Sequence, residues 1–256
     1  MSSRRQPWLL SASVANLVFL YAPIIVLILF SFNASRLSAT WQGFTLEWYR
    51  LLAEEEALGL SVRNSLVVAV VSTVVATGLG VCAAVGLERH PFRGREVVEG
   101  AMLLPLVIPE IMMGVSLMLF FLLVKLPLSL ITVTIGHAAF NVPIVLVIVR
   151  ARLRKLDPSL EEAARDLGAT SWQAFRRVTL PLLMPAILGS VLLAFTISLD
   201  DFIVTFFTAG PGSTTLPLYV YSMVKSGVTP AINALSAILV LVSMALIGAS
   251  LALQRR

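Results

Sequence analysis

The chain has 256 residues, of which 58% are hydrophobic and 13% are charged, and its mean hydropathy is +0.92. A soluble domain of this length could not bury so much apolar surface, and the net charge of +5 comes from basic residues at the ends of apolar segments, which indicates membrane topology rather than nucleic-acid binding. The only cysteine, Cys82, excludes an internal disulfide and a cysteine-based metal site, and we interpret it as a packing residue.

Six apolar runs are each long enough to cross a hydrocarbon core of about 30 Å, for which a helix needs about 20 residues. They lie at residues 9–32, 64–87, 100–124, 129–150, 186–208 and 232–253. The first run follows Arg4 and Arg5 and could be a signal peptide, but it is longer than the usual apolar region of such a peptide and no convincing cleavage site follows it, so we interpret it as a retained helix. The sequence therefore predicts an all-α polytopic membrane protein with about six transmembrane helices in a single domain, residues 1–256.

Lysines and arginines are distributed unequally between the two expected sides of the membrane. If the N-terminus is cytoplasmic, that side carries fourteen of them, including seven between residues 150 and 177. The other side carries five, namely Arg36, Arg50, Arg63, Lys125 and Lys225. By the positive-inside rule we expect both termini, and the loop at residues 151–185, to be cytoplasmic.

This loop carries the signals of a short amphipathic helix. Asp157 can cap free N–H groups and Pro158 suits a first helical turn, so we expect a helix from this point through Leu167. Gly168 then supplies a residue that adopts a left-handed turn without strain.

A second short helix is expected to follow the turn. Thr170 and Gln173 match a capping box that opens it, and Pro181 and Pro185 are expected to end it before the fifth apolar run. The loop would then form a helix-turn-helix across the cytoplasmic mouth. An amphipathic pair that rests on lipid headgroups fits the same periodicity, so this alternative stays open.

The spacing of several residues in this loop resembles that of a known family. Glu162-Ala163-Ala164, then Gly168, then Leu180-Pro181 resembles the EAA loop of permease subunits in binding-protein-dependent ABC importers. The resemblance implies a type I importer permease fold in the bacterial inner membrane and a coupling role for Glu162, Ala163, Ala164, Gly168, Leu180 and Pro181. It also implies two ATP-binding subunits, a sister permease and an extracytoplasmic substrate-binding protein as partners.

The chain lacks the G-x-x-x-x-G-K-[ST] loop that cradles nucleotide phosphates. We therefore expect it to bind no cofactor of its own and to be no enzyme, with ATP and its Mg²⁺ held by the partner subunits. Within a membrane-spanning complex, lipid would be its other contact.

Further stretches resemble the PotC-type permease of spermidine/putrescine importers. They are residues 104–114, 198–202, 208–210, 216–217 and 221–225. This resemblance covers most of the chain from the second run onward and implies a polyamine cargo. Permeases for sulfate, iron, phosphonate and amino acids share the EAA loop and remain alternatives, although the runs lack the cations that an anionic cargo would need.

Three carboxylates interrupt the apolar runs. Glu110 lies about ten residues into the third run, roughly 15 Å deep, and Asp200 and Asp201 lie about fifteen residues into the fifth, roughly 20 Å deep. A carboxylate at such a depth is costly unless it is paired or hydrated, so we expect these acids on the substrate pathway, facing the ammonium groups of a polyamine. Adjacent residues point to different faces, so at most one of Asp200 and Asp201 should contact cargo, and the other would cap a helix break or bond across a permease dimer.

Two other classes of protein fit parts of the sequence. A channel or ion-coupled secondary carrier would bind an ion at Glu110 and Asp200, but matching broken helices in the two halves of the chain are not evident. A membrane enzyme would need a nucleophile–base pair or metal ligands, and no such spacing is present. His137 could be a proton relay, although a hydrogen-bonded packing role is commoner for a lone membrane histidine.

Overall fold

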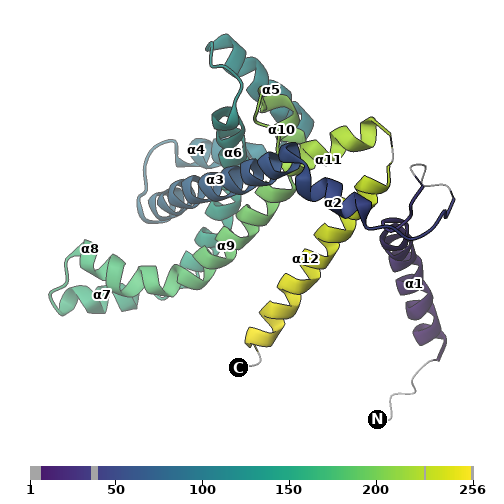
Figure 1. The fold of residues 1–256 in the computed structure, drawn as a ribbon. Coiled ribbons are helices and arrows are strands. Elements are labelled where there is room, and N and C mark those ends of the chain that lie inside the picture. Colours follow the sequence, from purple (N-terminus) through teal and green to yellow (C-terminus); the bar gives the residue numbers. More distant parts are fainter. Residues whose placement is uncertain (1–6, 36–39, 228, 255–256) are drawn as a thin grey trace. The chain divides into compact units, whose positions relative to one another are not determined.

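The computed structural model describes residues 7–35, 40–227 and 229–254 of the chain (Figure 1). The secondary structure of these residues is helical, apart from one isolated bridge between Asn33 and Phe44. Arg4, Arg5, Arg36, Arg255 and Arg256, on which part of the orientation argument rests, lie outside the described residues.

The chain divides into two compact units, residues 1–58 with 220–256 and residues 59–219. This division leaves the prediction of one transmembrane domain untested. The helices are, in chain order, α1 (Pro7–Phe30), α2 (Glu47–Glu54), α3 (Glu56–Arg89), α4 (Arg95–Val107), α5 (Glu110–Leu123), α6 (Leu130–Leu153), α7 (Ser159–Asp166), α8 (Ser171–Ala174), the π-helical segment η1 (Phe175–Thr179), α9 (Leu180–Asp200), α10 (Ile203–Thr208), α11 (Leu216–Lys225) and α12 (Pro230–Gln254).

In the first unit, α12 packs against α1 and α2. The segment that links α1 to α2 is held by Asn33, whose side-chain Nδ2 donates to the Thr40 carbonyl at 2.7 Å and whose Oδ1 accepts from the Gln42 N–H at 2.9 Å. Trp48 Nε1 donates to the Asn33 carbonyl at 2.8 Å. These bonds satisfy backbone groups of Asn33, Thr40 and Gln42 that no helix satisfies.

The core of the second unit lies where α3, α6 and α9 meet. A stripe of small residues on α3, including Ala76, Gly80 and Ala84, allows α6 to approach closely, which is how membrane helices without a hydrophobic driving force gain packing energy. A Cβ at Gly80 would lie 2.6 Å from the Val145 Cβ. Leu183 of α9 is buried in the same cluster.

The structure confirms an all-helical membrane protein but leaves the number of spans open. Four of its described helices are long and apolar enough to cross a membrane, or five if the bent pair α4 and α5 counts as one span. α12 is apolar over Pro230–Ala245, the part whose side chains are described. The count of six therefore stays a prediction.

The third apolar run is not the single helix that residues 100–124 suggested. It breaks between Val107 and Glu110, and α4 and α5 meet at 111°. Ile108 is extended, with φ −71° and ψ 131°, because the residue before a proline is disfavoured in the helical region and Pro109 follows it. The fifth run is also broken, since α9 ends at Asp200 and α10 begins at Ile203.

Pro181 and Pro185 do not end a helix, so this prediction is wrong. The chain is helical without interruption from Ser171 to Asp200, through α8, η1 and α9. The wider π turn ends at Thr179, two residues before Pro181, which lies in the first turn of α9, and Pro185 is accommodated inside α9 itself. Cys82 also differs from the prediction, because it is exposed on α3 rather than packed.

Candidate functional site: a coupling loop and an acidic cavity

The EAA loop forms two short helices at the end of α9 (Figure 1). Asp157 Oδ1 accepts a 3.0 Å hydrogen bond from the Ser159 N–H, at the start of α7. This bond, together with the Ser159 side chain, holds the pKa of the Asp157 carboxyl below its usual range. The predicted helix and its cap are therefore present.

The left-handed turn predicted at Gly168 is confirmed and forms a Schellman motif. Gly168 has φ +90°, its N–H donates to the Arg165 carbonyl at 2.8 Å, and the Ala169 N–H donates to the Ala164 carbonyl at 3.1 Å. A Cβ at Gly168 would meet nothing within 4 Å. Glycine is therefore required by the backbone conformation and not by crowding.

The predicted capping box also forms. The Thr170 N–H donates to Gln173 Oε1 at 2.9 Å, and the Gln173 N–H donates to Thr170 Oγ1 at 3.3 Å. Two otherwise unpaired donors are thus satisfied at the start of α8, which fixes the direction in which the long helix leaves the turn.

The residues of the EAA pattern do not share one environment. Glu162, Ala163, Gly168 and Pro181 are exposed, whereas Leu180 packs against the core between α3, α6 and α9. The exposed members offer a surface for a partner. Leu180 instead anchors the loop to the membrane helices.

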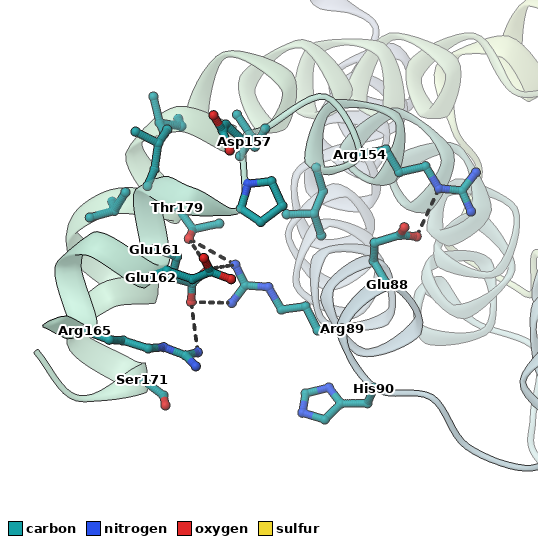
Figure 2. A pocket seen from close by; sticks show the side chains of 16 residues that line it. Glu88, Arg89, His90, Arg154, Asp157, Glu161, Glu162, Arg165, Ser171 and Thr179 are labelled. Carbon is teal, nitrogen blue, oxygen red and sulfur yellow. Dashed lines mark hydrogen bonds and ion pairs between the residues drawn. The ribbon is translucent and has the colours of Figure 1, made fainter.

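A pocket of about 610 Å³ lies between this loop and the carboxyl ends of α3 and α6 (Figure 2). Arg89, the last residue of α3, crosses it and forms a two-pronged ion pair with Glu161 of α7. The same guanidinium donates to Thr179 Oγ1 at 3.0 Å and lies 5.5 Å from the centre of the Phe175 ring. From the sequence, Arg89 was only one of the basic residues that indicate the orientation of the chain in the membrane, and Glu161 was not among the expected site residues.

The two helix breaks meet at a second cavity of about 540 Å³. Its lining includes all three acids expected on the pathway, Glu110, Asp200 and Asp201, together with Phe140 and Phe202. None of the described residues that line it is a lysine or an arginine. Glu110 opens α5 and Asp200 closes α9, so each break brings a carboxylate to the cavity wall.

Asp201 differs from the other two acids because its carboxylate is engaged within the chain. It accepts from the N–H groups of Val204 and Thr205, at 3.3 and 2.9 Å, and thereby caps α10. His137 Nε2 lies 3.1 Å from Asp201 Oδ2, and His137 Nδ1 lies 2.6 Å from Ser198 Oγ. This is the cap of a helix break that the sequence left open as an alternative for one of the two aspartates.

His137 is 1% exposed, and both of its ring nitrogens have partners, as expected of a packing histidine. Ser198 Oγ extends the network to Ser72 Oγ of α3, at 3.1 Å. Within the described residues, no three histidine, cysteine, aspartate or glutamate side chains stand together as a metal site would require. The network therefore fixes the geometry of the break between α9 and α10.

Residues 76–256 match the family model of the inner membrane component of binding-protein-dependent transport systems. The chain belongs to this family. PotC, the spermidine/putrescine transport system permease protein of Escherichia coli K12, is 43% identical over 232 residues, covering 91% of this chain and 88% of the relative. PotI, the putrescine transport system permease protein of the same strain, is 41% identical over 251 residues, covering 95% and 89%.

Solved structures of ABC importers share the fold. A bacterial ABC transporter involved in the import of the acidic polysaccharide alginate has a TM-score of 0.74 at 20% identity, with 100% of this chain and 98% of that chain covered. An amino acid ABC transporter with histidines has a TM-score of 0.62 at 17% identity, with 82% and 98% covered. The importer permease fold expected from the EAA loop is confirmed, and the protein is a multi-pass inner membrane permease.

Proposed function

We propose that this chain is the permease subunit of an ATP-driven importer of polyamines such as spermidine and putrescine. The observation that carries the proposal is the cavity at the two helix breaks, where Glu110 and Asp200 stand beside the aromatic rings of Phe140 and Phe202. The PotC and PotI relatives, named for polyamine transport, support the same cargo.

The cavity suits a chain of separated ammonium groups for three reasons. Carboxylates form charge-assisted hydrogen bonds with ammonium, and aromatic faces attract it. The carboxyl ends of α4 and α9 also stop at the cavity, and the unpaired carbonyls of a helix carboxyl end carry partial negative charge. Glu110 and Asp201 stand at the amino ends of α5 and α10, where their negative charge offsets the positive charge of these helix ends.

The long helix from Ser171 to Asp200 connects the coupling loop to this cavity. Its 30 residues span about 45 Å at 1.5 Å per residue. A displacement of α7 and α8 by an ATP-binding subunit would move the end that carries Asp200, and so would change access to the cargo. Glu162 and Ala163 at the exposed face of α7, with Gly168 in the turn, would form the docking surface.

The assembly we propose contains a sister permease, two ATP-binding subunits that hold ATP and Mg²⁺, and an extracytoplasmic binding protein. One structural neighbour is a bacterial alginate ABC transporter in complex with a periplasmic protein that holds an alginate pentasaccharide, and this complex supports the last of these partners. The coupling loop and both termini would face the cytoplasm, as the distribution of lysine and arginine indicates.

The test is uptake of labelled putrescine and spermidine into vesicles that contain the complete complex. Glu110→Gln and Asp200→Asn should each lower uptake at least about tenfold, because a hydrogen bond to a charged group contributes roughly 1.5–3 kcal/mol and each 1.36 kcal/mol is a factor of about ten. The matched control, Glu96→Gln, changes an exposed acid on α4 outside the cavity and should leave uptake unchanged. Uptake that proceeds without the ATP-binding subunits, or no ATP-driven polyamine uptake at all, would refute the proposal.

A further inference from the structure

Movement of the coupling loop can be transmitted to the cavity along the continuous helix from Ser171 to Asp200. A second, noncovalent connection between the loop and the cavity runs through α3. Arg89 is the terminal residue of α3, and its side chain is 25% exposed. Figure 2 shows it extending from α3 toward Glu161 and Thr179. One guanidinium thus holds two separate elements of the coupling loop.

The contacts of Arg89 are arranged around the π-helical segment. Phe175 opens η1 and Thr179 closes it, and the guanidinium contacts both residues. Thr179 Oγ1 also donates to Glu161 Oε2 at 3.0 Å, so α7 and η1 are bonded to each other as well as to α3. Single π turns inside α-helices are rare and are frequently found at functional sites, since they change the direction of the helix that follows.

The charges around Arg89 distinguish this contact from an ordinary surface ion pair. Its partner Glu161 is 17% exposed, and a planar guanidinium holds a carboxylate through two parallel bonds, which fixes orientation as well as distance. Arg165 also approaches Glu161, at 3.5 Å, but its side chain is 51% exposed and lies on the same helix. Of these two contacts, the one with Arg89 links α7 to a membrane helix.

We propose that Arg89 is a positioning residue that couples movement of the loop to movement of α3. The proposal rests on the proposed function, because it assumes that an ATP-binding subunit moves α7. Because Arg89 holds α7 and both ends of η1, a shift of α7 would pull the inner end of α3. α3 in turn bonds the network at the cavity through Ser72 and Ser198, so both sides of the helix break between α9 and α10 would respond together.

The experiment compares Arg89→Met with the control Arg165→Gln in vesicles that contain the complete complex. Arg89→Met keeps much of the length of the side chain but removes the guanidinium, and it should lower the polyamine imported per ATP hydrolysed about tenfold while ATP hydrolysis continues. Arg165→Gln removes the other arginine on the same carboxylate and should leave the ratio unchanged. The exchange Arg89→Glu with Glu161→Arg should recover part of the loss.

A second readout does not depend on the cargo. Cys82 is exposed on α3, seven residues before Arg89, and a fluorophore on it reports movement of α3 when the partner subunits lack cysteine. Trapping with ATP and vanadate should change its emission in the parent protein and in Arg165→Gln, but not in Arg89→Met. If the parent imports no polyamine but its label responds, the cargo assignment fails and the coupling role of Arg89 is judged on the label alone.

The proposal is overturned if Arg89→Met retains both the parental transport ratio and the parental label response. If Arg89→Met does not assemble, Glu161→Gln replaces it, since this variant keeps a hydrogen-bond acceptor for Thr179 but loses the ion pair. A parental ratio in Glu161→Gln would then overturn the proposal, and an uncoupled ratio would support it.

Discussion

Asp201 and Asp200 are adjacent, yet the structure separates their roles, and this separation can be measured. Asp201→Ala removes the side chain that caps α10 and that contacts His137. Loss of a helix cap costs about 1 kcal/mol, and a buried partner left unsatisfied costs about 1–3 kcal/mol. The free energy of unfolding should therefore fall by about 2–4 kcal/mol.

Asp201→Asn keeps an oxygen that can cap α10 and loses only the charge, so about half of this destabilisation is expected. Asp200→Asn should leave the free energy of unfolding unchanged, because its carboxylate lines the cavity from the exposed end of α9. Titration of the purified protein with dodecyl sulfate, followed by circular dichroism, gives all three values. Equal stability of Asp201→Ala and Asp200→Asn would show that the cap contributes nothing and that our separation of the two acids is wrong.

Three further predictions concern single positions. Gly210→Ala should prevent accumulation of folded protein in the membrane, because its Cβ would lie 1.8 Å from the Leu128 carbonyl oxygen. The control Gly189→Ala in α9 meets nothing within 4 Å and should be tolerated. Equal amounts of both variants on immunoblots would contradict this prediction. Gly168→Val should leave the subunit inserted in the membrane but abolish ATP-driven uptake. A φ of +90° is strained for valine by about 1–2 kcal/mol, so the turn between α7 and α8 must change. Normal uptake would reject the coupling role of this turn. The Asp157 carboxyl has a lowered pKa, so its contribution to the start of α7 is complete above the unfolded pKa of about 3.9 and is lost as pH falls through the folded value. The check is amide hydrogen exchange at the start of α7, where protection relative to the intrinsic exchange rate at each pH should fall on acidification in the parent but not in Asp157→Asn.

Much of the local structure of the coupling loop follows from sequence because its determinants are local. Asp157, Gly168 and the pair Thr170 and Gln173 each act on backbone groups within a few residues, so their patterns predict the caps and the turn that the structure contains. The prediction at Pro181 failed for a related reason. A proline removes one helix hydrogen bond but does not have to end the helix, since α9 continues through Pro185 and α6 through Pro143, and near Pro181 the π turn of η1 precedes it.

The sequence by itself determined the membrane environment, the helical class, the local structure of the EAA loop and the identity of the acids that interrupt the apolar runs, because composition, periodicity and capping are properties of neighbouring residues. Only the tertiary structure decided that the three acids meet at one cavity and that Asp201 among them caps a helix. Asp201 meets His137, 64 positions earlier in the chain, and Arg89 meets Glu161, 72 positions later. Such partners are selected by the packing of whole helices in three dimensions, and no local pattern along the chain encodes them.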